Sequence, residues 1–186
     1  RSALLPQGLG GTGGAVGGGL GAVEGAAQQA AATGAVNGTQ RRPMRLDQEI
    51  EELQERTFRW FEKVTDRRTG LTPDRWPTPS FCSVAAVGFA LTCWPVGVER
   101  GWMSRAEARE RTLTTLRFFW NAPQGPEPVG KTGHKGFFYH FLDMQTGRRF
   151  RQVELSSIDT SLLFAGMLFA REWFDCDHPE EAQLGA

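Results

Sequence analysis

The sequence predicts an all-α fold in which outer and inner helices form pairs, with one short β-hairpin between two of them. Two segments repeat apolar residues every three to four positions, as outer helices do, and two others are apolar all round, as inner helices are. The core must come from the chain beyond about residue 45, because every aromatic residue lies at or beyond Phe58.

Residues 1–43 differ in composition from the rest and are expected to be disordered. They hold more than half of the 23 glycines and few charged residues, so they offer little apolar surface to offset the entropy of ordering. We interpret them as a Gly/Ala-rich linker or the remnant of an export signal, which predicts a periplasmic or secreted protein. Residues 44–186 form the folded domain, and we expect the chain to be a fragment of a longer protein.

Charge and cysteine usage argue against several classes of function. The 21 basic residues balance the 21 acidic ones, so no net charge attracts nucleic acid or an anionic membrane. The three cysteines lack the spacing of metal ligands and are interpreted as small buried hydrophobes. We therefore expect no cofactor, no metal and no nucleic-acid partner, and the oligomeric state stays open.

The first predicted helix begins at Leu46 and ends near Val64. Its apolar face includes Ile50 and Leu53, and Asp47 is the expected N-cap. A proline-rich loop then precedes the next helix.

The second predicted helix runs from Phe81 to about Trp94, with Ser80 as its cap and prolines 79 and 95 as its limits. Its uncharged surface raises the possibility of a membrane span. About 15 residues are too few for a bilayer, which needs about 20, so we expect a buried core helix and no membrane span.

Two further helices are predicted at 105–121 and near 157–174. Ser104 and Glu107 form a capping box at the start of the third helix. Residues 175–182 contain a proline followed by acidic residues, which is typical of the start of a fifth helix. The residues expected to face inward on the third helix are Ala108, Thr112, Thr115 or Leu116, and Phe119.

Between these helices, residues 137–142 and 149–154 are predicted to pair as a hairpin around the turn at 143–147. Asp143 belongs to ordinary turn chemistry there, although it is also a candidate contact for substrate.

Two carboxylates at the start of the fourth helix are the candidate catalytic residues. Glu154 precedes the helix and Asp159 lies in its first turn, where either can act as a general acid or base. The alternative is that Ser156 and Asp159 form a helix cap, so that Asp159 only satisfies helix N–H groups.

Aromatic and polar residues near these carboxylates are candidates for substrate binding. Trp120 and Tyr139 can stack on sugar rings, and His140 and Lys135 can hydrogen-bond to hydroxyl groups. The alternative for the aromatic residues is a place in the core, and for Lys135 a solvated loop position.

Five stretches of the sequence, in order, resemble the bacterial glycoamylase-like family, whose characterised members include endo-β-1,2-glucanases. The resemblance covers about residues 44–181. The stretches are TFRWF at 57–61, PTPSFCSVAAVGF at 77–89, TTLRFFW at 114–120, GHKGFFYHFLD at 133–143 and ELSSIDT at 154–160.

The resemblance implies an (α/α)6 toroid, of which residues 44–186 are the N-terminal third. It also implies a glycoside hydrolase that inverts the anomeric centre and acts on an exported oligo- or polysaccharide. Glu154 and Asp159 match the acidic motif of the family, and which is acid and which is base stays open. Two alternatives are a carbohydrate-binding or scaffolding toroid without catalysis and a plain helical interaction domain.

Overall fold

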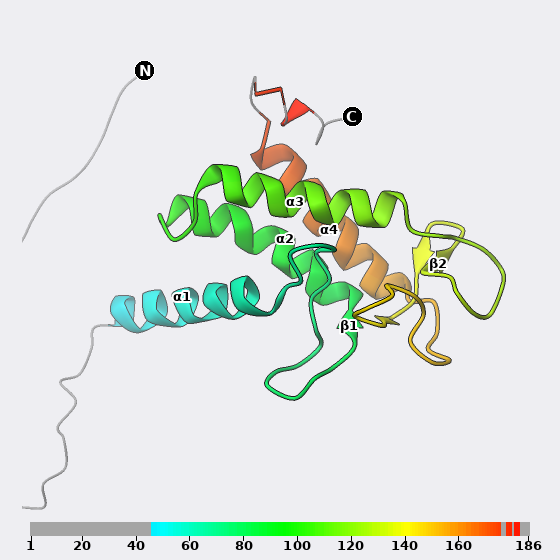
Figure 1. Ribbon diagram of the computed structural model, residues 1–186. Coiled ribbons are helices and arrows are strands. Elements are labelled where there is room, and N and C mark those ends of the chain that lie inside the picture. Colours follow the sequence, from blue (N-terminus) through cyan, green and yellow to red (C-terminus); the bar gives the residue numbers. More distant parts are fainter. Residues whose placement is uncertain (1–45, 176–177, 180, 183–186) are drawn as a thin grey trace, which may run out of the picture. The chain divides into compact units, whose positions relative to one another are not determined.

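A computed structural model describes residues 46–175, 178–179 and 181–182 (Figure 1). The expected disordered segment at 1–43 lies outside these residues, as do positions 176, 177 and 180 of the expected fifth-helix start at 175–182. The described part is mainly helical, as predicted, with short strands near one end of the helices. Its helices are α1 (Leu46–Val64), α2 (Val84–Glu99), α3 (Arg105–Trp120) and α4 (Ser157–Trp173).

The two predicted inner helices, α2 and α4, pack directly against each other and form the most extensive helix contact of the described chain. At their crossing, a Cβ on Gly88 would overlap the backbone carbonyl of Leu162, and a Cβ on Gly166 would overlap the carbonyl of Gly88. Glycine is required here because the two backbones meet without side chains between them.

The limits predicted for α2 are wrong at both ends. Ser83, not Ser80, is the N-cap, and its hydroxyl oxygen accepts from the amide of Ala86 at 3.4 Å. The chain enters this cap through a strand rather than through helix. At the other end α2 continues through Pro95 to Glu99. Burial of Trp94 and its apolar neighbours favours continuation of the helix despite the N–H that proline lacks.

Helix α3 agrees with the prediction. Ser104 accepts from the amide of Glu107 at 3.2 Å, and the predicted inward positions 108, 112, 115 and 119 are buried. Arg111 is also buried, with its guanidinium 4.9 Å from the centre of the Trp94 ring. The aliphatic part of the Arg111 side chain suits a buried position, while its guanidinium pairs with Glu107.

Helix α1 forms where predicted, but its expected apolar face is largely uncovered. Leu53 is 65% exposed and Ile50 is also exposed. Phe58, which is 2% exposed, is instead the anchor, with its ring 5.5 Å from Trp102 and 6.4 Å from Trp94. Asp47 is not the cap but lies inside the first turn, where its negative charge interacts favourably with the helix dipole.

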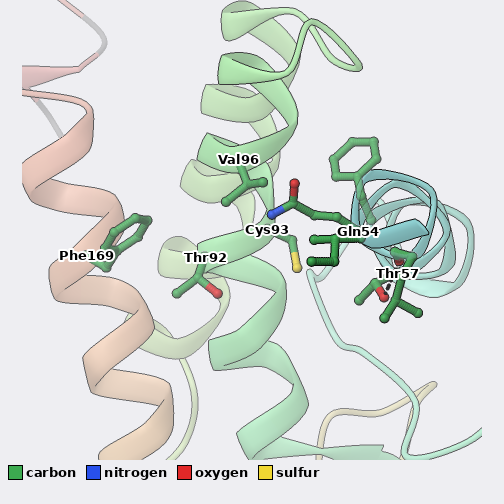
Figure 2. A pocket seen from close by; sticks show the side chains of 9 residues that line it. Gln54, Thr57, Thr92, Cys93, Val96 and Phe169 are labelled. Carbon is green, nitrogen blue, oxygen red and sulfur yellow. Dashed lines mark hydrogen bonds between the residues drawn. The ribbon is translucent and has the colours of Figure 1, made fainter. Parts of the chain in front are cut away.

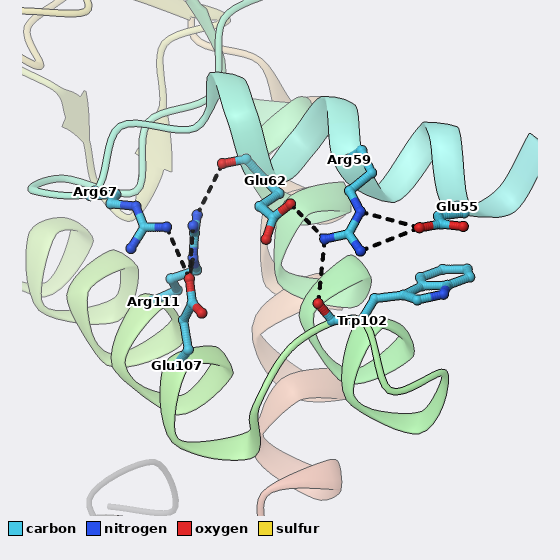
Figure 3. Close-up of polar contacts among 7 residues, drawn as sticks. All are labelled: Glu55, Arg59, Glu62, Arg67, Trp102, Glu107 and Arg111. Carbon is cyan, nitrogen blue, oxygen red and sulfur yellow. Dashed lines mark hydrogen bonds and ion pairs between the residues drawn. The ribbon is translucent and has the colours of Figure 1, made fainter.

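Polar contacts supplement this single aromatic anchor (Figure 3). Arg59 donates to the Glu62 carboxylate at 2.9 Å and to the Glu55 carboxylate at 3.3 Å, both on α1. It also reaches the backbone carbonyl of Trp102, in the connection between α2 and α3, at 3.4 Å.

A second group of polar contacts links α1 to α3 in the same view (Figure 3). Glu107 accepts from Arg67 at 3.0 Å and from Arg111 at 3.1 Å, and Arg111 donates to the backbone carbonyl of Glu62 at 3.4 Å. Because Arg111 is buried, this link is better protected from solvent than the contacts of Arg59.

In the part of the chain that the structure describes, four two-residue strands form two separate pairs in place of the single hairpin expected. β2 (Gly133–His134) pairs with β3 (Phe137–Phe138), and β1 (Cys82–Ser83) pairs with β4 (Phe141–Leu142), both antiparallel. Residues Lys135 and Gly136 form the β2–β3 turn with φ values of 52° and 83°, as two-residue hairpins require.

The predicted turn at 143–147 is present, but the pairing of its arms is only partial. Asp143 accepts from the amides of Gln145 and Thr146 at 3.1 and 2.8 Å, which fixes the turn. Residues 149–154 meet the 137–142 arm through scattered hydrogen bonds, and Arg151 adopts a φ of 51°. Residues 141–142 pair with β1 and also keep an isolated antiparallel bridge to the second arm, between Leu142 and Arg149.

Candidate active site

Backbone hydrogen bonds place residues 138–140 between the starts of both inner helices. The amide of Val84 donates to the carbonyl of His140 at 3.2 Å, and the amide of Ser156 donates to the carbonyl of Phe138 at 3.0 Å. The amide of Phe138 also donates to the Thr160 hydroxyl, on α4, at 2.9 Å. This segment therefore presents His140 to the residues that open α4.

The structure brings both predicted catalytic carboxylates to the same imidazole. Nδ1 of His140 lies 2.9 Å from Oε1 of Glu154, and Nε2 lies 3.7 Å from Oδ1 of Asp159. The first distance is that of a hydrogen bond, whereas the second is too long for one and within reach of charge attraction. His140 was predicted to contact substrate; the sequence did not reveal that it joins the two carboxylates.

The two carboxylates differ in their surroundings. The Glu154 side chain is 68% exposed, and the pKa of its carboxyl is lowered by its own backbone amide, by the hydrogen bond from His140 and by the charges of His140 and Arg149. The Asp159 side chain is 13% exposed, and its Oδ2 accepts from the Ser156 hydroxyl. Glu154 is thus an ionised carboxylate that is open to solvent, whereas the Asp159 side chain is largely shielded from solvent.

The helix-cap interpretation holds for Ser156 but not for the Asp159 carboxylate, which accepts from the Ser156 hydroxyl instead of from a helix N–H group. Ser156 is the N-cap of α4, and its hydroxyl oxygen accepts from the Asp159 amide at 3.1 Å. With this cap in place, Oδ1 of Asp159 still faces His140. Asp159 therefore takes part both in the start of α4 and in the site.

The remaining predicted residues do not gather at this cluster. The Tyr139 ring is buried beneath the Arg149 guanidinium, which lies 4.5 Å from the ring centre. Trp120 is 89% exposed at the end of α3, and Lys135 is exposed in the β2–β3 turn. Asp143 is engaged in its own turn, where the Thr146 amide and hydroxyl and the Gln145 amide lower its pKa.

Sequence reasoning missed Arg149, which covers Tyr139 and contributes positive charge at Glu154. Its side chain also donates to the carbonyl of Val153 at 2.7 Å, which holds the segment before Glu154 in place. The predicted turn at 143–147 was the available signal, because it brings residues beyond the turn back toward Tyr139.

An open apolar pocket of about 420 Å³ lies between α1, α2 and α4 (Figure 2). Its lining includes Leu53, Cys93 and Phe169, and none of the residues of the carboxylate cluster. Burial raises the pKa of the Cys93 thiol to about 12, as it does for Cys82. Cys82 is buried as predicted and Cys93 is partly buried, whereas Cys176 lies outside the described residues. A lining of this kind offers few partners for sugar hydroxyl groups.

Within the described residues, no group of three His, Cys, Asp or Glu side chains is arranged to hold a metal ion. None of the helices in that part of the chain combines the length and apolar character of a membrane span.

Comparison with known proteins identifies relatives that act on β-1,2-linked glucans, although no family model matches the chain. Over 148 residues it is 27% identical to an exo-β-1,2-glucooligosaccharide sophorohydrolase (non-reducing end) of Parabacteroides distasonis, covering 76% of this chain and 19% of that protein. The crystal structure of a β-1,2-glucanase from the same organism superposes with a TM-score of 0.63 at 28% identity, over 76% of this chain and 20% of the other.

The fold is also similar to that of an endo-β-1,2-glucanase of Chitinophaga pinensis, solved with sophorotriose and glucose. The TM-score is 0.62 at 23% identity, over 76% of this chain and 34% of the other. The chain thus spans about a fifth of the length of the curated relative that it matches.

Proposed function

We propose that the chain belongs to the glycoamylase-like family and that it is part of a glycoside hydrolase that cleaves glucans, β-1,2-linked ones in particular. The names of the two relatives from Parabacteroides distasonis support the linkage. The observation that carries the chemistry is the exposed, ionised Glu154 held by His140 beside the start of α4.

The complete protein forms an (α/α)6 toroid, and this chain supplies its first helix pairs. Export to the periplasm or out of the cell would bring such an enzyme to a polymeric substrate. The alternating character of the four helices supports the toroid, since the charged α1 and α3 alternate along the chain with the more apolar α2 and α4.

Cleavage proceeds with inversion by two carboxyl groups. One carboxylic acid gives its proton to the glycosidic oxygen as the bond to the anomeric carbon breaks, and a carboxylate takes a proton from the water that attacks this carbon. Glu154 suits the second role because its lowered pKa keeps it ionised and its side chain is open to solvent. Asp159 is the other candidate carboxyl group, and Trp120, Tyr139, His140, Asp143 and Lys135 are the candidate substrate contacts.

Reducing-sugar release by the protein from the complete reading frame tests this function. The substrates are β-1,2-, β-1,3- and β-1,4-glucans, with starch as the α-linked control. We expect release from β-1,2-glucan and a loss of about 10²- to 10⁴-fold in Glu154→Gln and Asp159→Asn.

Glu127→Gln is the matched control, because Glu127 is also an exposed carboxylate whose pKa is lowered by its own amide and by a basic neighbour. Near-wild-type rates in both site variants would reject the assignment of these carboxylates.

A second candidate function is glucan binding without hydrolysis. It is favoured by the position of His140, whose ring lies between Glu154 and Asp159, where a scissile bond flanked by these two groups would have to lie. Retention of β-1,2-glucan by a folded protein that releases no sugar from any polymer would establish it.

A further inference from the structure

We propose that His140 is a positioning residue, which fixes the Glu154 carboxylate through Nδ1 and keeps Nε2 directed at Asp159. The inference rests on the function proposed above and deepens it, because it assigns a task to a side chain that sequence reasoning gave only to substrate contact. Its basis is the geometry of the ring and of the groups around it.

The His140 ring is held by contacts that leave it little freedom to turn. It stacks on Phe141, with ring centres 3.8 Å apart and planes 27° apart, and Phe141 in turn lies 4.2 Å from Phe81. The His140 amide donates to the backbone carbonyl of Glu154 at 3.0 Å. Backbone and side chain of His140 therefore both contact Glu154, which fixes the two residues opposite each other.

The chemistry of the partners fixes where the imidazole proton lies. An ionised carboxylate only accepts hydrogen bonds, so the 2.9 Å contact requires Nδ1 of His140 to carry the proton toward Glu154. Neutral His140 then has a lone pair on Nε2, facing Oδ1 of Asp159 at 3.7 Å. Protonation of Nε2 changes this contact into attraction and leaves the bond to Glu154 in place.

The charged groups around the ring come from two sides. Glu154 and Arg149 belong to the segment before α4, and Asp159 belongs to α4 itself. From the start of α2, the contact is the uncharged Val84, through its backbone amide. Two acidic groups thus face one imidazole, and the positive charge of Arg149 also acts on Glu154.

This arrangement affects Glu154, the carboxylate proposed to take a proton from the attacking water. The folded-state pKa of Glu154 is below its ordinary value, so the carboxylate is ionised at neutral pH and becomes protonated only as the pH falls through this lowered value. Removal of the Nδ1 donor raises the pKa of Glu154. The acidic limb of the pH profile of kcat/KM then moves to higher pH.

Two substitutions separate the two ring nitrogens. In His140→Asn the amide nitrogen lies near the place of Nδ1 and can still donate to Glu154, whereas in His140→Gln it reaches the place of Nε2 instead. The titration midpoint of Glu154 is measured in wild type and both variants by NMR of side-chain ¹³C-labelled glutamate. His134→Gln is the control, since His134 acts on Glu127.

We expect the Glu154 midpoint to move to higher pH in His140→Gln, by less in His140→Asn and not at all in the control. The ¹⁵N shifts of the wild-type imidazole provide a test that needs no variant, and we expect neutral His140 to carry its proton on Nδ1. A proton on Nε2, or an unchanged Glu154 midpoint in a folded His140→Gln protein, would overturn the proposal.

These readouts do not depend on hydrolysis. If the midpoint shifts as expected while no glucan is cleaved, His140 positions Glu154 and the proposed hydrolase function fails. If glucan is cleaved and the midpoint does not shift, the function stands and the role of His140 is rejected. In an active protein, a parallel shift of the acidic limb in His140→Gln adds support, whereas a lower rate with an unmoved limb indicates a merely structural role.

Discussion

Helices α1 and α4 both pack against α2, but they do so by opposite means. At the α2–α4 crossing the backbones touch at Gly88 and Gly166, without side chains between them. Helix α1 reaches the core through one fully buried ring, that of Phe58, and adds exposed charged contacts such as those of Arg59 (Figure 3). The inner pair is therefore held by direct contact between backbones, whereas α1 is held mainly by one buried side chain.

This difference teaches that an apolar stripe identifies a helix without identifying what covers it. Ile50 and Leu53 have the expected spacing, yet both are exposed and border the open pocket (Figure 2). In the toroid that we propose, such a face meets a neighbouring helix.

Loss of the Phe58 ring is expected to have the largest effect, because it removes the anchor of α1. We expect Phe58→Ala to lower the free energy of unfolding by about 4 kcal/mol, through lost burial and a cavity beside Trp94 and Trp102. Leu53→Ala, on the same helix, should change it by less than about 0.5 kcal/mol. Urea unfolding monitored by circular dichroism measures both, and equal losses would contradict the single-anchor description.

A methyl group at the glycine crossing is expected to have the next largest effect. Gly88→Ala should lower the free energy of unfolding by about 2 kcal/mol, because the overlap with the Leu162 carbonyl outweighs the better helix propensity of alanine. Ser161→Ala, at an exposed position of α4, serves as the control in the same unfolding experiment. A gain in stability for Gly88→Ala would show that the helices separate easily, and the contrast with α1 would disappear.

The smallest effect is expected for the exposed charges that hold α1. Arg59→Ala should lower the free energy of unfolding only slightly, because exposed ion pairs are weak. The difference between variant and wild type should shrink further in 1 M salt, where such pairs are screened within about 3 Å. Melting temperatures of wild type and variant at low and high salt measure this difference. A large loss of stability that does not depend on salt would show that Arg59 is a second anchor of α1.

The sequence predicted the four helices correctly because their signals are local. Ser104 and Ser156 cap helices with ordinary motifs, and the buried face of α3 follows the helical period. The start of α2 was misplaced because Ser83 follows a two-residue strand, too short to produce an alternating pattern. That strand pairs with β4, far along the chain.

The same limit applies to the candidate site. Glu154, Asp159 and His140 were each chosen from their types and their places near the start of α4. Their meeting depends on the register that sets His140 opposite Glu154, and this register follows an irregular segment in which Arg151 adopts positive φ. No periodic pattern encodes such a segment, so the contact between His140 and the carboxylates became visible only in three dimensions.

The hydrogen bonds from Val84 to His140 and from Phe138 to Thr160 tie the site to the first turns of α2 and α4. Amide protons in these bonds should exchange with solvent only when the two inner helices come apart. Hydrogen exchange should then find the amides of Val84 and Phe138 protected to the same degree as the glycine crossing. The imidazole and its two carboxylates would keep their arrangement through every local opening that leaves the inner pair intact.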